Sequence, residues 1–195
     1  MMNELEIKKY QSLNKLANCG GIVLFGSKEL FEIPLCELKQ AFDINDDLYN
    51  RSFKSVSLAD AQNIYTECIS EIKPDTLFIQ LGSDDIDLFA NDKDKFISLY
   101  RNLVSVIKRS NKKCRIAIVS LKNHNSDKAV AEMNSMLKYV ADSEKCEFCD
   151  ISSKKTCSPA QVKSISSFIH NMGFVQPVQC KRPIYDLSRM IFCFE

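Results

Sequence analysis

Short apolar runs alternate with stretches of helical periodicity along most of this chain. The runs are rich in Ile, Val, Leu and Phe, a pattern typical of strands that are buried on both faces of a parallel sheet. They predict strands over residues 22–25, 76–81, 115–121 and 147–151, with a further extended segment over 47–56.

The segments around these strands carry apolar residues at helical spacing. They predict helices over residues 4–18, 28–42, 57–72, 92–109, 127–142 and 158–172. The first segment has four apolar positions typical of an amphipathic helix, at Leu5, Tyr10, Leu13 and Leu16. Pro34 predicts a break in the second helix, and Ser57 with Asp60 forms a capping box that predicts the start of the third.

This alternation of strand and helix predicts a three-layer α/β/α sandwich with about five parallel strands and right-handed crossovers. A chain of 195 residues is expected to form one domain, over 1–175. Residues 176–195 form a C-terminal tail, and its apolar side chains predict either packing back onto the domain or an interface between copies. In such a sheet the functional residues follow the carboxyl ends of the strands.

Composition narrows the function classes. The five glycines fit neither the GxGxxG nor the GxxxxGK[ST] spacing of phosphate loops. With 26 Lys+Arg against 25 Asp+Glu, no charge excess favours nucleic acid or an anionic membrane as a partner. No apolar run approaches the roughly 18 residues of a membrane span. The chain has nine cysteines, an odd number, and its N-terminus lacks the apolar stretch of a signal peptide. Both features predict a cytoplasmic protein with free thiols.

Cys146 and Cys149 have the CxxC spacing of a zinc site. Cys157 follows them, and Cys180 or Cys193 is a candidate fourth ligand. However, the pair falls on a predicted strand, where residues three apart face opposite sides of the sheet. We therefore expect no metal here and no other cofactor.

The residues that follow the predicted strands carry more information. Residues 73–85, KPDTLFIQLGSDD, combine a Pro-Asp pair, an apolar strand and a Gly-Ser-Asp-Asp turn. Residues 23–28, VLFGSK, and 49–52, YNRS, follow the earlier strands in the same way. These segments resemble the third, first and second sequence blocks of the SGNH (GDSL) hydrolases. The resemblance spans residues 20–173 and implies a sandwich of the SGNH-hydrolase, flavodoxin-like type.

The residues that name the family are all replaced. In an ungapped comparison Lys28 stands at the nucleophilic serine, and Ser27 stands at the aspartate before it. Ser52 stands at the glycine of the oxyanion hole, and Asp84 stands at its asparagine. Residues 152–158, SSKKTCS, hold no counterpart of the final Asp-x-x-His block.

These replacements favour loss of the hydrolase chemistry. An ionised Asp84 about 4 Å from the developing negative charge would cost about 4 kcal/mol at an effective dielectric of about 20, or roughly a thousandfold in rate. Lys28 is a poor nucleophile while its ammonium group keeps its proton. Because the strands before Lys28 and Asp84 are expected to be neighbours, we expect these two side chains to form an ion pair.

The sequence therefore predicts a pseudoenzyme that is SGNH-like and binds a ligand or partner through a remodelled cleft. The residues expected to line this cleft are Ser27, Lys28, Ser52, Gly82 and Asp84. By family analogy the ligand is a carbohydrate or an acylated small molecule.

Two alternatives use other residues. In the first, the chain is an active GDSL-type esterase or acetyl hydrolase, with Ser27 as nucleophile and His124 as its base, since a triad is defined by geometry and not by sequence order. His170 falls near the end of a predicted helix and is expected to be structural. In the second, the chain is a structural homo-oligomer or an accessory subunit that uses its tail.

Overall fold

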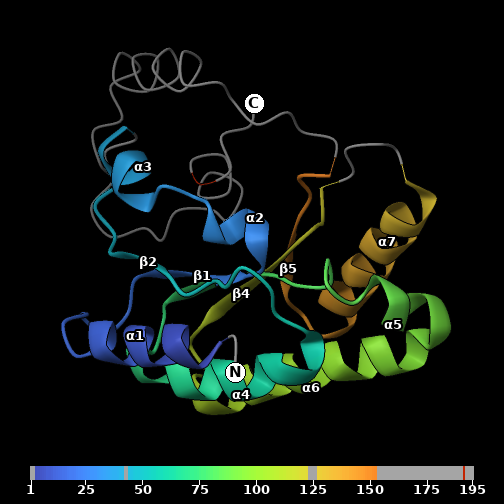
Figure 1. Ribbon diagram of the computed structural model, residues 1–195, viewed down its shortest axis with the longest axis horizontal. Coiled ribbons are helices and arrows are strands. Elements are labelled where there is room, and N and C mark those ends of the chain that lie inside the picture. Colours follow the sequence, from blue (N-terminus) through green and yellow to red (C-terminus); the bar gives the residue numbers. More distant parts are fainter. Residues whose placement is uncertain (1–2, 42–43, 123–126, 153–190, 192–195) are drawn as a thin grey trace.

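The computed structural model describes residues 3–41, 44–122, 127–152 and 191 of the chain. Within them, five parallel strands form one sheet in the order β2-β1-β3-β4-β5. The strands are β1 (Ile22–Gly26), β2 (Leu48–Asn50), β3 (Thr76–Gln80), β4 (Arg115–Val119) and β5 (Glu147–Cys149). Helices lie on both faces of this sheet (Figure 1), which confirms the predicted three-layer sandwich.

One face of the sheet carries the four longest of the described helices, the short α5 and the larger hydrophobic cluster. These helices are α1 (Glu4–Asn14), α4 (Leu58–Cys68), α5 (Ile86–Asn91), α6 (Lys93–Ser110) and α7 (Lys128–Ser143). Phe25 and Ile79 point to this face, whereas Leu24 and Phe78 belong to the smaller cluster on the other face, as the alternation of a strand requires.

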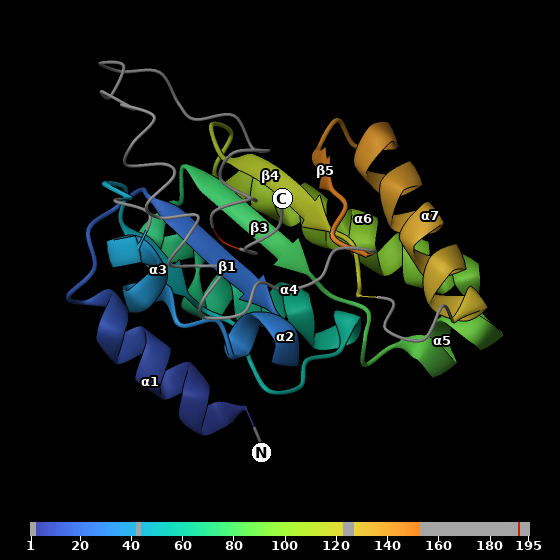
Figure 2. The same cartoon turned by 90° about the horizontal axis from the view of Figure 1, so that it is seen from above.

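The other face is covered by two short helices, α2 (Lys28–Phe31) and α3 (Leu35–Ala41), as Figure 2 shows. Ile191, which is 2% exposed, packs into the cluster on this face, so the chain returns to the sheet close to its C-terminal end. The predicted helix over 158–172 and most of the tail lie outside the described residues. None of the described helices is long and apolar enough to cross a membrane.

Local signals placed most of the helix boundaries. The break at Pro34 separates α2 from α3, and Ser57 caps α4 by accepting a hydrogen bond from the backbone N–H of Asp60 at 3.3 Å. The predicted helix over 57–72 divides into α4 and a short 3-10 helix, Ser70–Ile72. The six-residue helix α5 was not predicted, because it is too short for its apolar periodicity to stand out.

The apolar pattern of α1 was misleading. Tyr10 and Asn14 face the core, each with its side chain hydrogen bonded to a buried backbone carbonyl. Of the three leucines in the predicted helix over 4–18, Leu5 and Leu13 are 79% and 41% exposed, and Leu16, at 85%, lies beyond the end of α1. The buried side of α1 therefore carries Tyr10 and Asn14 and not the leucines.

Candidate functional site

The turn after β1 places Ser27 at the edge of the sheet. β1 ends at Gly26, where an added Cβ would lie 2.5 Å from the backbone oxygen of Gln80 on β3, so the two strands approach too closely for a side chain. Ser27 comes next and is 3% exposed, and its Oγ lies 2.5 Å from the Oγ of Ser83. Ser83 follows Gly82, whose φ of 119° is left-handed and favours glycine. The structure thus brings Ser27 beside the Gly82 turn.

Ser52 lies in the loop after β2 and is fully buried, with 0% exposure. Its backbone N–H donates to Oδ1 of Asn50 at 3.0 Å, and its Oγ donates to the backbone oxygen of Leu24 at 3.3 Å. Its own backbone oxygen accepts from Oη of Tyr10 at 2.5 Å. Each polar group of Ser52 is therefore engaged inside the protein.

Arg51 anchors the same loop without an acidic partner in the described part of the chain. Its Nε donates to Oδ1 of Asn14 at 3.0 Å, and a terminal nitrogen donates to the backbone oxygen of Asn50 at 3.0 Å. The guanidinium lies 5.2 Å from the ring centre of Tyr10 and 5.5 Å from that of Tyr49. Burial lowers the pKa of Arg51 and raises the pKa of Tyr10 to about 12.

The acidic turn after β3 holds the loop that leads into α4. Oδ2 of Asp84 accepts from the backbone N–H of Val56 at 2.8 Å. Both carboxylate oxygens of Asp85 accept from the backbone N–H of Leu58, at 3.2 and 3.0 Å. Asp85 is 5% exposed, and this burial raises the pKa of its carboxyl group. Within the part of the chain that the structure describes, these two carboxylates are the acceptors for the backbone N–H groups of Val56 and Leu58.

The predicted ion pair between Lys28 and Asp84 is wrong. No ion pair joins them among the described residues, because Asp84 is turned to the Val56 N–H and Lys28 is exposed at the start of α2. Lys28 instead lines a cleft of about 310 Å³ together with Glu29, Glu32 and Lys122. This cleft, lined by two cations and two carboxylates, lies where β1 and β4 end.

A chain of polar side chains crosses the same edge of the sheet below the cleft. Nε2 of Gln80 donates to Oε2 of Glu29 at 3.0 Å and to the backbone oxygen of Ser120 at 2.9 Å. Oγ of Ser120 in turn donates to Oδ1 of Asp150 at 3.1 Å and accepts from the N–H of Ile151 at 2.8 Å. Sequence reasoning missed these residues. The signal that could have identified them is a polar residue at the end of an apolar strand, which is Gln80 in β3 and Ser120 directly after β4.

The comparisons with known proteins show the fold. No protein-family model and no curated protein matches the sequence. The structure is similar to a Streptococcus pneumonia protein named for platelet activating factor, with a TM-score of 0.68 and 15% identity over 88% of this chain and 92% of that one. It is also similar to a GDSL-like lipase from Bacteroides thetaiotaomicron, with a TM-score of 0.58 and 14% identity over 74% and 77% of the two chains. An acetylxylan esterase from Geobacillus stearothermophilus matches with a TM-score of 0.52 and 16% identity over 77% and 81%. The chain has an SGNH-hydrolase-like fold.

Within this SGNH-like fold, neither the backbone N–H of Ser52 nor the side chain of Asp84, at the two positions aligned with the oxyanion hole, is a free donor, and neither residue lines the cleft of about 310 Å³. Ser52 is buried and its N–H is already bonded, and Asp84 carries a carboxylate where the family has an amide. Asn134 on α7 clamps the end of β4, since its side chain donates to the Leu121 oxygen at 2.8 Å and accepts from the Leu121 N–H at 2.7 Å.

Of the histidines and cysteines considered as catalytic or metal-binding residues, the structure describes only some. His124 and His170 lie outside the described residues, as do Cys157, Cys180 and Cys193. Cys146 packs against the larger hydrophobic cluster and Cys149 lies in the smaller one, on the opposite face of the sheet. Among the described residues, no group of three or more His, Cys, Asp and Glu side chains is arranged to hold a metal.

Proposed function

We propose that this chain is a non-catalytic SGNH-like domain that binds a small polar ligand in the cleft at the strand ends. The observation that supports this most is the state of the two positions aligned with the oxyanion hole. Loss of a single oxyanion donor in a serine hydrolase costs about 10²–10³ in rate. Here the N–H of Ser52 is bonded inside the protein, and Asp84 brings a negative charge instead of a donor.

The cleft itself supports a polar ligand of modest size. Its volume of about 310 Å³ is near the lower end of the range of about 300–1,000 Å³ that is typical of small-molecule sites. Glu29 is held in place by Gln80, a side chain that is only 2% exposed, so this carboxylate is presented in a fixed position. Charged side chains on every side suit the hydroxyl groups of a sugar better than a long acyl chain. A carbohydrate, free or acetylated, is therefore the proposed ligand.

Binding is tested by calorimetric titration of the protein with a panel of monosaccharides and their O-acetylated forms. Glu29→Gln removes the charge and keeps an acceptor for Gln80, and it should weaken binding about tenfold, the loss of one charge-assisted hydrogen bond. Glu37→Gln makes the same change on an exposed residue of α3 outside the cleft and should leave binding unchanged. Absence of binding by every sugar, or equal effects of the two variants, would refute the carbohydrate proposal.

The lack of esterase chemistry is tested with a fluorophosphonate probe, which labels an activated serine. We expect no labelling of the wild-type protein. The second candidate function is an esterase that uses Ser27. It is favoured by the 2.5 Å contact between the Oγ atoms of Ser27 and Ser83, because this contact holds the Ser27 Oγ at the strand end. Labelling that is lost in Ser27→Ala and kept in Ser83→Ala would establish this second function and overturn the first.

A further inference from the structure

A second groove lies between α6 and α7, outside the cleft at the strand ends. It has a volume of about 740 Å³ and combines one aromatic, two aliphatic and five polar or charged side chains. They are Asp94, Ile97, Ser98, Arg101, Asn102, Ser135, Met136 and Tyr139. Tyr139 is 54% exposed, which is high for a large aromatic side chain on a helix that packs against the core.

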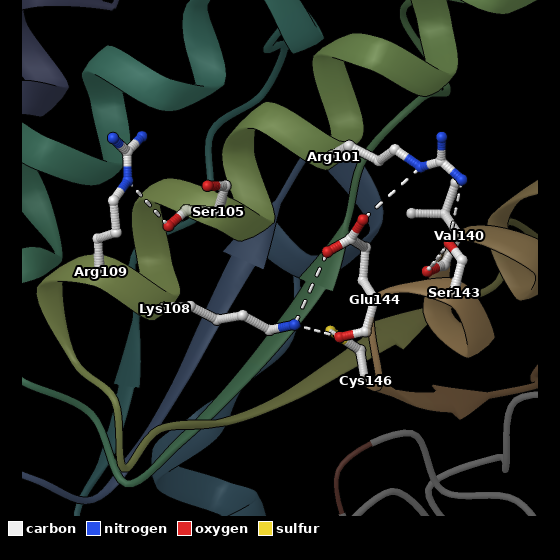
Figure 3. Close-up of polar contacts among 8 residues, drawn as sticks. All are labelled: Arg101, Ser105, Lys108, Arg109, Val140, Ser143, Glu144 and Cys146. Carbon is white, nitrogen blue, oxygen red and sulfur yellow. Dashed lines mark hydrogen bonds and ion pairs between the residues drawn. The ribbon is translucent and has the colours of Figure 1, made fainter.

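Arg101 lines this groove and contacts three side chains of α7 and the turn that follows it. Its guanidinium lies 5.6 Å from the ring centre of Tyr139. A terminal nitrogen donates to Oγ of Ser143 at 3.3 Å (Figure 3). Its Nε is buried, makes no hydrogen bond among the described residues, and lies 3.7 Å from a carboxylate oxygen of Glu144. Glu144 also faces Lys108, at 3.8 Å, so one carboxylate is shared by two cations. Arg101 therefore keeps unused donors and uncompensated positive charge.

Asp94 supplies the opposite charge at the other end of the groove. It is exposed and forms no ion pair within the described part of the chain. Asp94 and Arg101 are seven residues apart on α6, which is two turns and about 10.5 Å along the helix axis. They share the solvent side of α6 with Ser98, opposite the buried side chains of Phe96 and Tyr100.

We infer that a second copy of this chain docks on this groove, with the two α6 helices antiparallel. When two copies of α6 run in opposite directions and cross between residues 97 and 98, Asp94 of one copy faces the partner's Arg101. The two-fold axis then forms the same pair a second time, because a C2 interface uses the same patch on both subunits. Each copy of α6 thus contributes Asp94 to one ion pair and Arg101 to the other. This spacing is the observation that selects a copy of the chain over another partner.

The size and composition of the surface fit this assignment. The 18 residues of α6 span about 27 Å, and an adjacent helix at about 8–10 Å widens the face to roughly 20 Å. This is roughly 540 Å² on each copy, and the two copies together reach the lower limit of about 1,000 Å² for a specific interface. Tyr, Met and Arg are among the residue types enriched at interfaces, and Tyr and Arg are also enriched among the residues that contribute most to binding. Tyr139, Met136 and Arg101 supply these types. The inference does not depend on the proposed ligand, and it places the dimer contact on α6 and α7 and not on the tail.

Charge reversal tests the inference directly. Asp94→Arg places two arginines opposite each other at both contacts, and Arg101→Asp places two aspartates there. Each variant alone should raise the dimer dissociation constant by at least about a hundredfold, because like charges at an interface are strongly repulsive. An equimolar mixture of the two variants should form a heterodimer, since each arginine of one chain then faces an aspartate of the other.

The measurement is the molar mass by sedimentation equilibrium, over protein concentrations from about 1 μM to about 1 mM, the range in which weak to moderate complexes dissociate. Glu67→Arg makes the same kind of charge reversal on an exposed residue of α4 and should leave the dimer unchanged. Far-ultraviolet circular dichroism verifies that each variant is folded. A wild-type protein that stays monomeric over this range, a dimer that both single variants retain, or a mixture that fails to associate would overturn the inference.

Discussion

Replacing Tyr10 by Phe removes one hydrogen bond beside the candidate site and leaves the ring in place. Tyr10 is 6% exposed, and its hydroxyl lies 2.5 Å from the backbone oxygen of Ser52, a residue with 0% exposure. The ring keeps its edge-to-face contact with Phe53, at 5.3 Å between centroids, and its place beside Arg51. The variant therefore leaves a buried carbonyl without that donor, and we expect the free energy of unfolding to fall by about 1–3 kcal/mol.

Two further tyrosines serve as matched controls. The hydroxyl of Tyr65 lies 2.6 Å from Oγ of Ser110, which is exposed, so water replaces the lost partner and Tyr65→Phe should cost under about 1 kcal/mol. The hydroxyl of Tyr100 lies near the backbone of Leu81 but makes no hydrogen bond among the described residues. Tyr100→Phe removes a buried, unsatisfied group and should be neutral or stabilising.

Urea unfolding followed by circular dichroism measures all three variants. The slope of the free energy against urea should stay the same, because the change in exposed surface on unfolding is the same. Equal losses of stability in Tyr10→Phe and Tyr65→Phe, or a larger loss in Tyr100→Phe than in Tyr10→Phe, would refute this prediction. Either result would mean that burial of the acceptor does not determine the cost.

Three other predictions concern pH and packing. The pKa of Tyr10 is raised from its ordinary 10.0 to about 12 in the folded protein. The contribution of Tyr10 to stability is therefore present below pH 10 and is lost as the pH rises through 12. Tyr10→Phe should remove this alkaline loss of stability, as measured by urea unfolding at each pH. Gly26→Ala places a Cβ 2.5 Å from the backbone oxygen of Gln80 and should lower the melting temperature by several degrees, in proportion to a cost of about 1–3 kcal/mol. Asp85 has a folded pKa above its ordinary 3.8, so wild-type stability falls as pH rises through that raised value. Asp85→Asn should remove this fall and still accept from Leu58, and an unchanged pH profile would contradict the assignment.

The layers of the fold were predictable because they depend on local pattern. An apolar run such as β1 is buried on both faces in any arrangement of a parallel sheet, and the cap at Ser57 needs only Asp60 three residues later. The buried side of α1 was not predictable in this way. It depends on Tyr10 and Asn14 finding carbonyls 42 and 54 residues away, and no periodicity within the helix reports such partners.

The candidate site, like the fold, was predictable from the sequence only in part. Ser27 and the Gly82 turn lie side by side in the structure, because neighbouring parallel strands end at one edge of the sheet. The partner of Asp84 was predicted wrongly, since charge alone suggested Lys28 while a backbone N–H satisfies the carboxylate at 2.8 Å. Asn50 was missed because its role lies in contacts to backbone atoms, with Ser52 and with the end of α2.

If the chain is the non-catalytic domain proposed above, changing Asp84 alone should not create esterase activity, because the contacts of Ser52 stay in place. Asp84→Asn keeps an oxygen that can accept from the Val56 N–H, so the fold should be retained within about 1 kcal/mol, and the new amide adds a donor in the turn after β3. The N–H of Ser52, however, stays bonded to Asn50 in a residue with 0% exposure, and a substrate oxygen has no route to it. We therefore expect Asp84→Asn to remain unlabelled by a fluorophosphonate. If this one substitution is enough to produce labelling that also requires Ser27, then the buried Ser52 does not close the oxyanion hole, and Asp84 alone separates this chain from an esterase.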